Sequence, residues 1–96
     1  MATIRTHRYT VDPLDVAEFV ARRGRLIAAV RVAHPGLVQT RLTRLDDATF
    51  TDTWRWETAE QMQAAAVLAR TLPEAGAAMS LVRDHSAEDG DVIDER

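Results

Sequence analysis

Residues 48–57 read Ala-Thr-Phe-Thr-Asp-Thr-Trp-Arg-Trp-Glu and contain both tryptophans of the chain. Successive side chains of a strand point to opposite faces, so this stretch has two chemically different sides. The aromatic side carries a single carboxylate and consists of Phe50, Asp52, Trp54 and Trp56. The other side is polar but rich in methyl and methylene groups, and consists of Thr51, Thr53, Arg55 and Glu57. We therefore predict a strand whose aromatic side is covered by the rest of the chain.

Length and composition indicate one small domain. The 96 residues, 46% hydrophobic and 28% charged, leave room for one core, so we treat residues 1–96 as a single domain. No apolar run is long enough to span a bilayer, and the chain enters a strand without a signal peptide. We expect a cytoplasmic protein with no membrane partner. The formal net charge of −3 argues against a nucleic-acid partner.

The residue types that are missing exclude several chemistries. Without cysteine there is no disulfide and no thiol nucleophile, and without lysine there is no Schiff base. No His, Asp or Glu pair has metal-ligand spacing on a helix, and no glycine-rich loop could cradle a phosphate. We predict neither a metal nor a cofactor. The arginines at 22, 23, 25 and 31 are expected on one solvated helix face.

Hydrophobic periodicity and turn residues divide the chain into strands and helices. Asp12 before Pro13 predicts a helix start, His34-Pro35-Gly36 predicts its end, and Thr58 predicts the cap of the next helix. We predict strands over 3–11, 37–45, 48–57 and 86–95, and helices over 13–33, 59–71 and 74–82. Residues 85–96 are acidic and could instead form a frayed tail.

This order of elements predicts an α+β fold. Strand, helix, hairpin, helices and strand is the ferredoxin-like split βαβ pattern, in which a four-stranded antiparallel sheet carries its helices on one face. The second face would stay bare and carry Ile4, Thr6, Arg8, Thr51, Thr53 and Arg55. Because so small a sheet gains from extra burial, we predict a homodimer whose sheet faces pack together as a dimeric α+β barrel.

Three motifs occur together with this pattern: Arg-Tyr-Thr-Val before Asp-Pro at 8–13, His-Pro-Gly-Leu at 34–37, and Trp-Arg-Trp-Glu-Thr at 54–58. In these features the chain resembles the antibiotic biosynthesis monooxygenase domain family, from about residue 2 to residue 82. That resemblance implies a pocket between helices and sheet, lined by Trp56 at the end of the third strand. The family often has asparagine where this chain has His7. Haem-degrading members have a histidine on the following helix, which is absent between Glu57 and Arg83.

The resemblance and the strand faces together suggest an active site. His7 is either a hydrogen-bonded structural histidine or a general base, and Asp52 on the neighbouring strand is expected to orient its imidazole. Trp54 and Trp56 either fill the core or form a flat aromatic pocket. The predicted catalytic residues are His7, Asp52 and Trp56, and the predicted substrate-binding residues are Tyr9, Phe50, Trp54, Met62, Met79 and Arg41. Arg41 and Arg5 could also be salt-bridged surface residues.

Three functions remain open from the sequence. The first is a cofactor-independent monooxygenase in which His7 deprotonates an aromatic polyketide-like phenol or quinol and the resulting anion reduces O2. The second is a polyketide cyclase or isomerase that uses the same base without oxygen. The third is a non-catalytic dimer that binds a small molecule. Consumption of O2 distinguishes the first from the other two.

Overall fold

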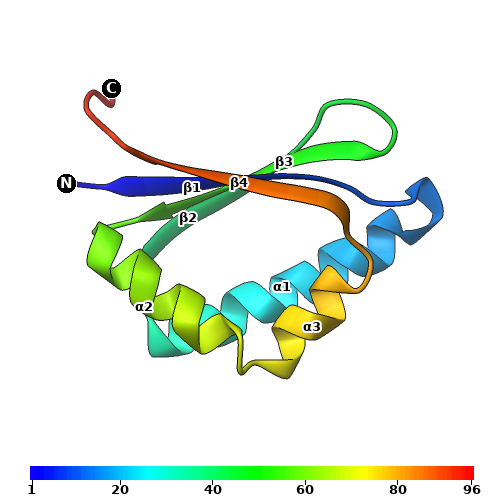
Figure 1. Cartoon of the computed structure of the whole chain (residues 1–96), viewed down its shortest axis with the longest axis horizontal. Coiled ribbons are helices and arrows are strands. Elements are labelled where there is room, and N and C mark those ends of the chain that lie inside the picture. The colour runs from blue at the N-terminus through cyan, green and yellow to red at the C-terminus, as the bar shows by residue number, and fades with distance from the viewer.

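The computed structural model describes all 96 residues as one α+β unit (Figure 1). The elements, in chain order, are β1 (Thr3–Thr10), the 3-10 turn η1 (Pro13–Asp15), α1 (Val16–Ala33), β2 (Leu37–Arg44), β3 (Thr49–Trp56), α2 (Ala59–Ala69), α3 (Pro73–Met79) and β4 (Arg83–Asp91). The predicted order of strands and helices is confirmed. None of the helices combines the length and apolarity needed to cross a bilayer.

The four strands form one antiparallel sheet in the order β2-β3-β1-β4. Strand β1 is central and pairs with β3 in an unbroken register that places His7 opposite Asp52. On its other edge β1 pairs with β4, where the register shifts between Arg8 and Thr10. The chain therefore brings its two ends together, since the first and last strands are neighbours.

All helices cover one face of this sheet (Figure 1). Two local bonds explain where they begin: the Asp12 side chain accepts from the Leu14 amide, and the Thr58 hydroxyl accepts from the Gln61 amide. On the buried side of α1, Phe19, Ile27 and Val30 pack against the sheet. Val20, in the same helix, is 47% exposed.

The core has two parts under the helices. One lies below α1 and α2 and consists of Ile27, Val30, Leu37, Trp56, Met62 and Ala65. The other lies below α1 and α3 and consists of Tyr9, Val11, Phe19, Phe50 and Ala78. The aromatic side of β3 thus contributes one ring to each part, and Trp54 and Asp52 lie between them in sequence.

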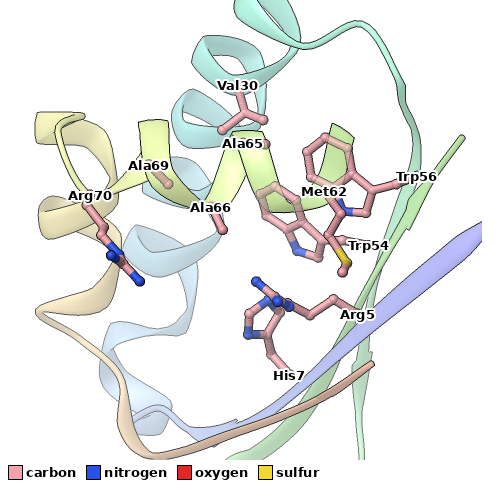
Figure 2. Close-up of a pocket in the computed structure, with 10 residues that line it drawn as sticks. All are labelled: Arg5, His7, Val30, Trp54, Trp56, Met62, Ala65, Ala66, Ala69 and Arg70. Carbon is pink, nitrogen blue, oxygen red and sulfur yellow. The ribbon is translucent and has the colours of Figure 1, made fainter. Parts of the chain in front are cut away.

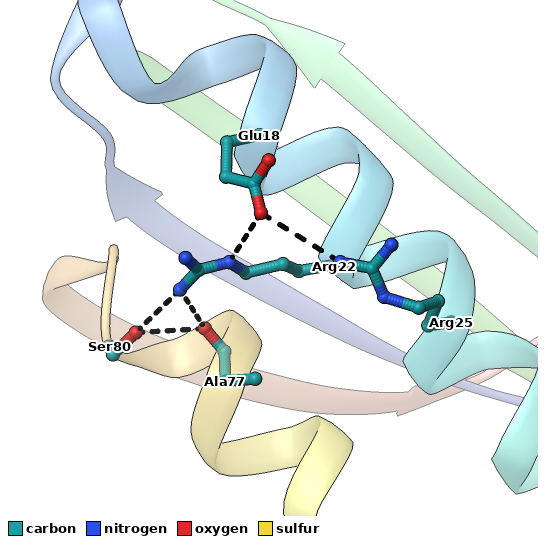
Figure 3. Close-up of polar contacts among 5 residues, drawn as sticks. All are labelled: Glu18, Arg22, Arg25, Ala77 and Ser80. Carbon is teal, nitrogen blue, oxygen red and sulfur yellow. Dashed lines mark hydrogen bonds and ion pairs between the residues drawn. The ribbon is translucent and has the colours of Figure 1, made fainter.

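Arg22 connects α1 to α3 through a group of polar contacts (Figure 3). Its guanidinium donates to the Ala77 carbonyl at 2.9 Å and to the Ser80 hydroxyl at 3.1 Å, while Glu18 accepts from its Nε at 2.9 Å. The carbonyls at a helix C-terminus lack partners within the helix, and a cation there is favourable. Arg22 therefore caps the C-terminal end of α3 and links this helix to α1.

The last strand begins three residues earlier than predicted. We predicted residues 86–95, whereas β4 spans Arg83–Asp91. Asp84 adopts a left-handed backbone with φ of 54°, at the register shift between β1 and β4. A non-glycine residue in this conformation at a bulge carries no clear sequence signal. The difference matters because it adds His85 to the sheet.

Candidate functional site

A cavity of about 300 Å³ lies between α2 and the helix-covered face of β1 and β3 (Figure 2). Its wall consists of Arg5, His7, Val30, Trp54, Trp56, Met62, Ala65, Ala66, Ala69 and Arg70. The side chains of Arg5 and His7 extend from β1 toward α2, whose alanines close the opposite side (Figure 2). Because alanine has no atoms beyond Cβ, this face of α2 leaves space over the sheet. A small planar molecule matches a cavity of this size and lining.

The two indoles form one wall of the cavity. The Trp54 and Trp56 rings lie 6.4 Å apart between centroids with an interplanar angle of 25°. Trp56 is 4% exposed and belongs to the core, whereas Trp54 is only partly buried. The two interpretations of this pair, core filling and an aromatic pocket, therefore both apply in part. Trp56 packs in the core and also lines the cavity. The wall that they present is flat and apolar.

His7 is the titratable group between the indoles and the rim. Its ring meets Trp54 edge to face, with centroids 6.3 Å apart. Burial lowers the pKa of His7 to about 4, and this outweighs the opposing effect of the Asp52 carboxylate. The imidazole is therefore neutral near pH 7 and has a lone pair available as a base. Its Nδ1 lies 2.8 Å from Nε2 of His85, which leaves His7 Nε2 for a ligand.

Asp52 does not orient His7 by a hydrogen bond, which corrects our expectation. Its carboxylate instead accepts four hydrogen bonds from other residues. Tyr9 Oη donates at 2.6 Å, Arg23 donates from Nε at 2.9 Å and from Nη2 at 2.8 Å, and Trp54 Nε1 donates at 2.9 Å. The carboxylate side chain is 5% exposed and that of Arg23 is 13% exposed. Asp52 is therefore the centre of a buried ion pair that fixes the plane of the Trp54 indole.

Tyr9 is held in its neutral form by this network. Burial, followed by the nearby Asp52 carboxylate, raises the pKa of the Tyr9 phenol far above its usual range. A phenol that donates to a carboxylate and lies in the core cannot supply a phenolate near neutral pH. Tyr9 thus acts as a hydrogen-bond donor that stabilises Asp52.

An exposed ion pair forms the rim of the cavity on the β4 side. Arg5 Nε and Nη2 donate to the two carboxylate oxygens of Asp89 at 2.7 and 3.0 Å. The hydrogen bond from Arg5 is the main cause that lowers the pKa of Asp89. Arg5 is therefore salt-bridged, as one of the two interpretations expected. Its side chain also lines the cavity.

Four of the predicted site residues lie in the cavity wall: His7, Trp54, Trp56 and Met62. The strand alternation brings the first three to one side of the sheet, and Met62 faces them from α2. Their chemical roles remain predictions.

The other predicted binding residues lie elsewhere. Tyr9 and Phe50 are 3% and 2% exposed in the second part of the core, because they lie at the end of the β1/β3 pair that α3 covers. Met79 ends α3 and is 42% exposed. Arg41 pairs with Thr53 across β2 and β3, which places it on the bare face of the sheet. These four assignments are corrected.

Two residues next to the cavity, Arg23 and His85, were not predicted as part of the site. Arg23 was expected on a solvated face, but it lies in helical register with Phe19, Ile27 and Val30 on the buried side of α1. That spacing was a signal that could have revealed its buried role. His85 was placed outside the last strand, so its position beside His7 had no basis in the predicted boundaries.

The site offers few ligands for a metal. No group of three or more His, Cys, Asp or Glu side chains is arranged to hold a metal ion. The two imidazoles of His7 and His85 bond to each other, and the nearest carboxylates, Asp52 and Asp89, are each paired with an arginine. What the arrangement can do is bind an aromatic ring against indoles and accept a proton at His7 Nε2.

Comparison with known proteins finds relatives in structure. No protein-family model and no curated protein matches the chain. The chain is similar in structure to SnoaB of Streptomyces nogalater, a cofactor-independent oxygenase, with a TM-score of 0.78, 23% identity, and coverage of 98% of this chain and 95% of that one. A protein of Caulobacter crescentus, provisionally described as an antibiotic biosynthesis monooxygenase, gives a TM-score of 0.77, 16% identity, and coverage of 97% and 91%.

A dimeric ferredoxin-like protein from an uncultured marine organism is also similar, with a TM-score of 0.74, 11% identity, and coverage of 99% of this chain and 90% of that one. At such identities the likeness concerns the fold. The sheet order, the helices on one face and these three structures agree. The chain therefore has the ferredoxin-like α+β fold of SnoaB and of the Caulobacter crescentus protein.

Proposed function

We propose that this protein is a cofactor-independent monooxygenase that oxidises an aromatic polyketide-like phenol or quinol with O2. The observation that carries the proposal is a neutral, partly buried imidazole, His7, in a cavity walled by two indoles. A phenol whose ring lies along Trp54 and Trp56 can direct its hydroxyl toward His7 Nε2. The description of SnoaB as a cofactor-independent oxygenase supports the same chemistry for this fold.

The reaction needs only a base, an aromatic substrate and O2. His7 Nε2 accepts the phenolic proton, and the electron-rich anion then transfers electrons to O2. For a phenol that becomes a quinone, one oxygen atom enters the ring and the other leaves as water, while the substrate supplies all the electrons. The indoles and Met62 exclude water from the reacting carbon, which limits side reactions of reduced oxygen.

Oxygen uptake with a panel of phenols, naphthols and hydroquinones tests the proposal. We expect O2 consumption that depends on the protein and matches quinone formation one to one. Substrate conversion without O2 uptake would indicate the cyclase or isomerase instead. Binding without conversion of any panel member would indicate a non-catalytic small-molecule-binding protein.

Filling the cavity from α2 should block binding. The Ala66→Phe substitution places a ring where the substrate would lie, so we expect phenol affinity to fall by roughly tenfold or more, about 1.4 kcal/mol. Quenching of Trp54 and Trp56 fluorescence by 1-naphthol measures the affinity. The matched control is Ala64→Phe, which adds the same ring on the exposed side of α2. Equal affinities in the two variants would place the ligand outside this cavity.

We also propose that the protein acts as a homodimer through the bare face of its sheet. Helices cover the other face (Figure 1), and the open face carries Ile4, Thr6 and Arg8 of β1 opposite Arg55, Thr53 and Thr51 of β3. Three of these side chains are threonines, whose methyl groups suit a covered surface. His7 lies on the helix-covered face, so each subunit would keep its own cavity. The dimeric ferredoxin-like neighbour supports a dimer of this fold.

The Thr53→Glu variant is expected to dissociate the dimer. A carboxylate at the centre of the open face would be desolvated and would face its own copy across a two-fold interface. Sedimentation velocity over a range of concentrations measures the effect. Gln63→Glu on the exposed side of α2 adds the same charge and should leave the dimer intact. A wild-type protein that sediments as a monomer at all concentrations would refute the proposed dimer.

A further inference from the structure

The imidazoles of His7 and His85 form a direct pair at the edge of the cavity. His7 Nδ1 and His85 Nε2 are 2.8 Å apart, and the rings stack with centroids 5.1 Å apart and an interplanar angle of 23°. One nitrogen of such a pair must carry the shared proton, so the bond couples the tautomer of one ring to that of the other. The pair joins the cavity, where His7 lies, to the exposed strand β4.

His85 lies in β4 next to a bulge. Arg8 pairs with Ser86 and Thr10 pairs with Arg83, so Asp84 and His85 together face the single residue Tyr9. Asp84 is the extra residue of this bulge, and its backbone is left-handed, with φ of 54°. His85 lies on the same side of the sheet as His7, because Ala87 pairs with His7 and His85 is two residues from Ala87 on the same strand. His85 itself is exposed to solvent.

A proton taken up by His7 needs a route away from the cavity. Burial makes the charged form of His7 unfavourable and lowers its pKa to about 4, so the imidazole holds a second proton poorly. The charged groups that act on it are Asp52, His85, Arg5 and Asp89. Asp52 is saturated by four donors, and Asp89 is bound by Arg5 through both oxygens. His85 is the one neighbour with both a bond to His7 and access to water.

We propose that His85 is the proton exit of this site: as His7 Nε2 accepts the phenolic proton, His7 Nδ1 passes its own proton to His85 Nε2, and His85 Nδ1 releases one to water. The proposal rests on the proposed oxygenase function. One proton leaves the substrate and one enters solvent, so the pair ends neutral and the substrate becomes an anion. In the resting state His85 also selects the His7 tautomer, because a proton on Nδ1 leaves Nε2 as the base.

The His85→Ala variant tests this role. We expect kcat to fall by about 100-fold, the lower end of what a positioned proton-transfer group contributes, with KM for the phenol unchanged. Added imidazole should restore part of the lost rate in this variant and should not affect the wild type. A merely structural role would not produce rescue by a diffusible proton carrier. His34→Ala, a substitution in the loop after α1, is the control and should retain wild-type kinetics.

Nitrogen NMR of the resting protein tests the tautomer without any substrate. We expect His7 to carry its proton on Nδ1 and to shift toward a mixture of tautomers in His85→Ala. Protonation of His7 at Nε2 in the resting protein would overturn the proposal, and so would a His85→Ala variant with wild-type kcat and no response to imidazole. If the wild type consumed no O2 with any phenol, the oxygenase function itself would fail, which is a separate result.

Discussion

The Asp52→Asn variant is expected to lower the free energy of unfolding by about 3–5 kcal/mol, the cost of removing one member of a buried ion pair. The substitution keeps the size of the side chain and removes only its charge. Arg23, whose side chain is 13% exposed, would then carry a charge among core residues without a counter-ion. Tyr9 and Trp54 would have to share one carbonyl oxygen as acceptor where they now use two carboxylate oxygens.

Urea denaturation followed by tryptophan fluorescence measures this loss. The control is Glu18→Gln, which removes a charge from the exposed pair with Arg22 and should change the stability far less. Adding Arg23→Met to Asp52→Asn removes the stranded charge, so the double variant should be more stable than Asp52→Asn alone. Equal stabilities for Asp52→Asn and Glu18→Gln would show that the Asp52 network contributes little to the fold.

The His7→Ala variant is expected to lose about 100- to 10,000-fold in kcat, the range that a general base contributes. Binding should persist, because the indoles of Trp54 and Trp56 remain. O2 uptake measures turnover, and fluorescence quenching by 1-naphthol measures binding. His34→Ala removes an imidazole outside the site and serves as the control. Wild-type kcat in His7→Ala would exclude His7 as the base.

The wild-type pH profile provides a second check on His7. The base acts only when neutral, so activity should be present above its pKa and lost as pH falls through it. Since burial lowers the pKa of His7 to about 4, kcat/KM should fall with a midpoint near pH 4 and not near 6.5, the value of an exposed histidine. This acidic limb should disappear in the residual activity of His7→Ala. A wild-type midpoint near 6.5 would indicate a more hydrated imidazole.

His7 and Asp52 illustrate how much of the site the sequence can predict. Strand alternation was enough to place His7, Trp54 and Trp56 on one side of the sheet, and helix periodicity placed Met62 opposite them. The same rule put Asp52 on that side, but it could not tell which of its neighbours would bond to it. Arg23 approaches from α1 and donates two hydrogen bonds to the carboxylate, a geometry that suits a guanidinium.

Position along a strand also decided which residues line the cavity. Tyr9 and Phe50 lie on the same side of the sheet as Trp54 and Trp56. However, α3 packs over Tyr9 and Phe50, so these two residues belong to the core. Met79 and Arg41 lie elsewhere for other reasons. Met79 is the last residue of α3 and is 42% exposed. A register shift near the start of β2 accompanies the placement of Arg41 on the bare face. None of these outcomes follows from the local alternation of side chains.

The sequence alone determined the order of elements, the antiparallel sheet with helices on one side and the aromatic side of β3, because hydrophobic periodicity and capping residues act over a few positions. Tertiary structure alone decided which groups share a hydrogen bond across the sheet. The pairing of His7 with His85 depends on the register between β1 and β4, and the pairing of Asp52 with Arg23 depends on the packing of α1 over the sheet. Both bonds join residues far apart in the chain, so their geometry exists only once the strands and helices have packed.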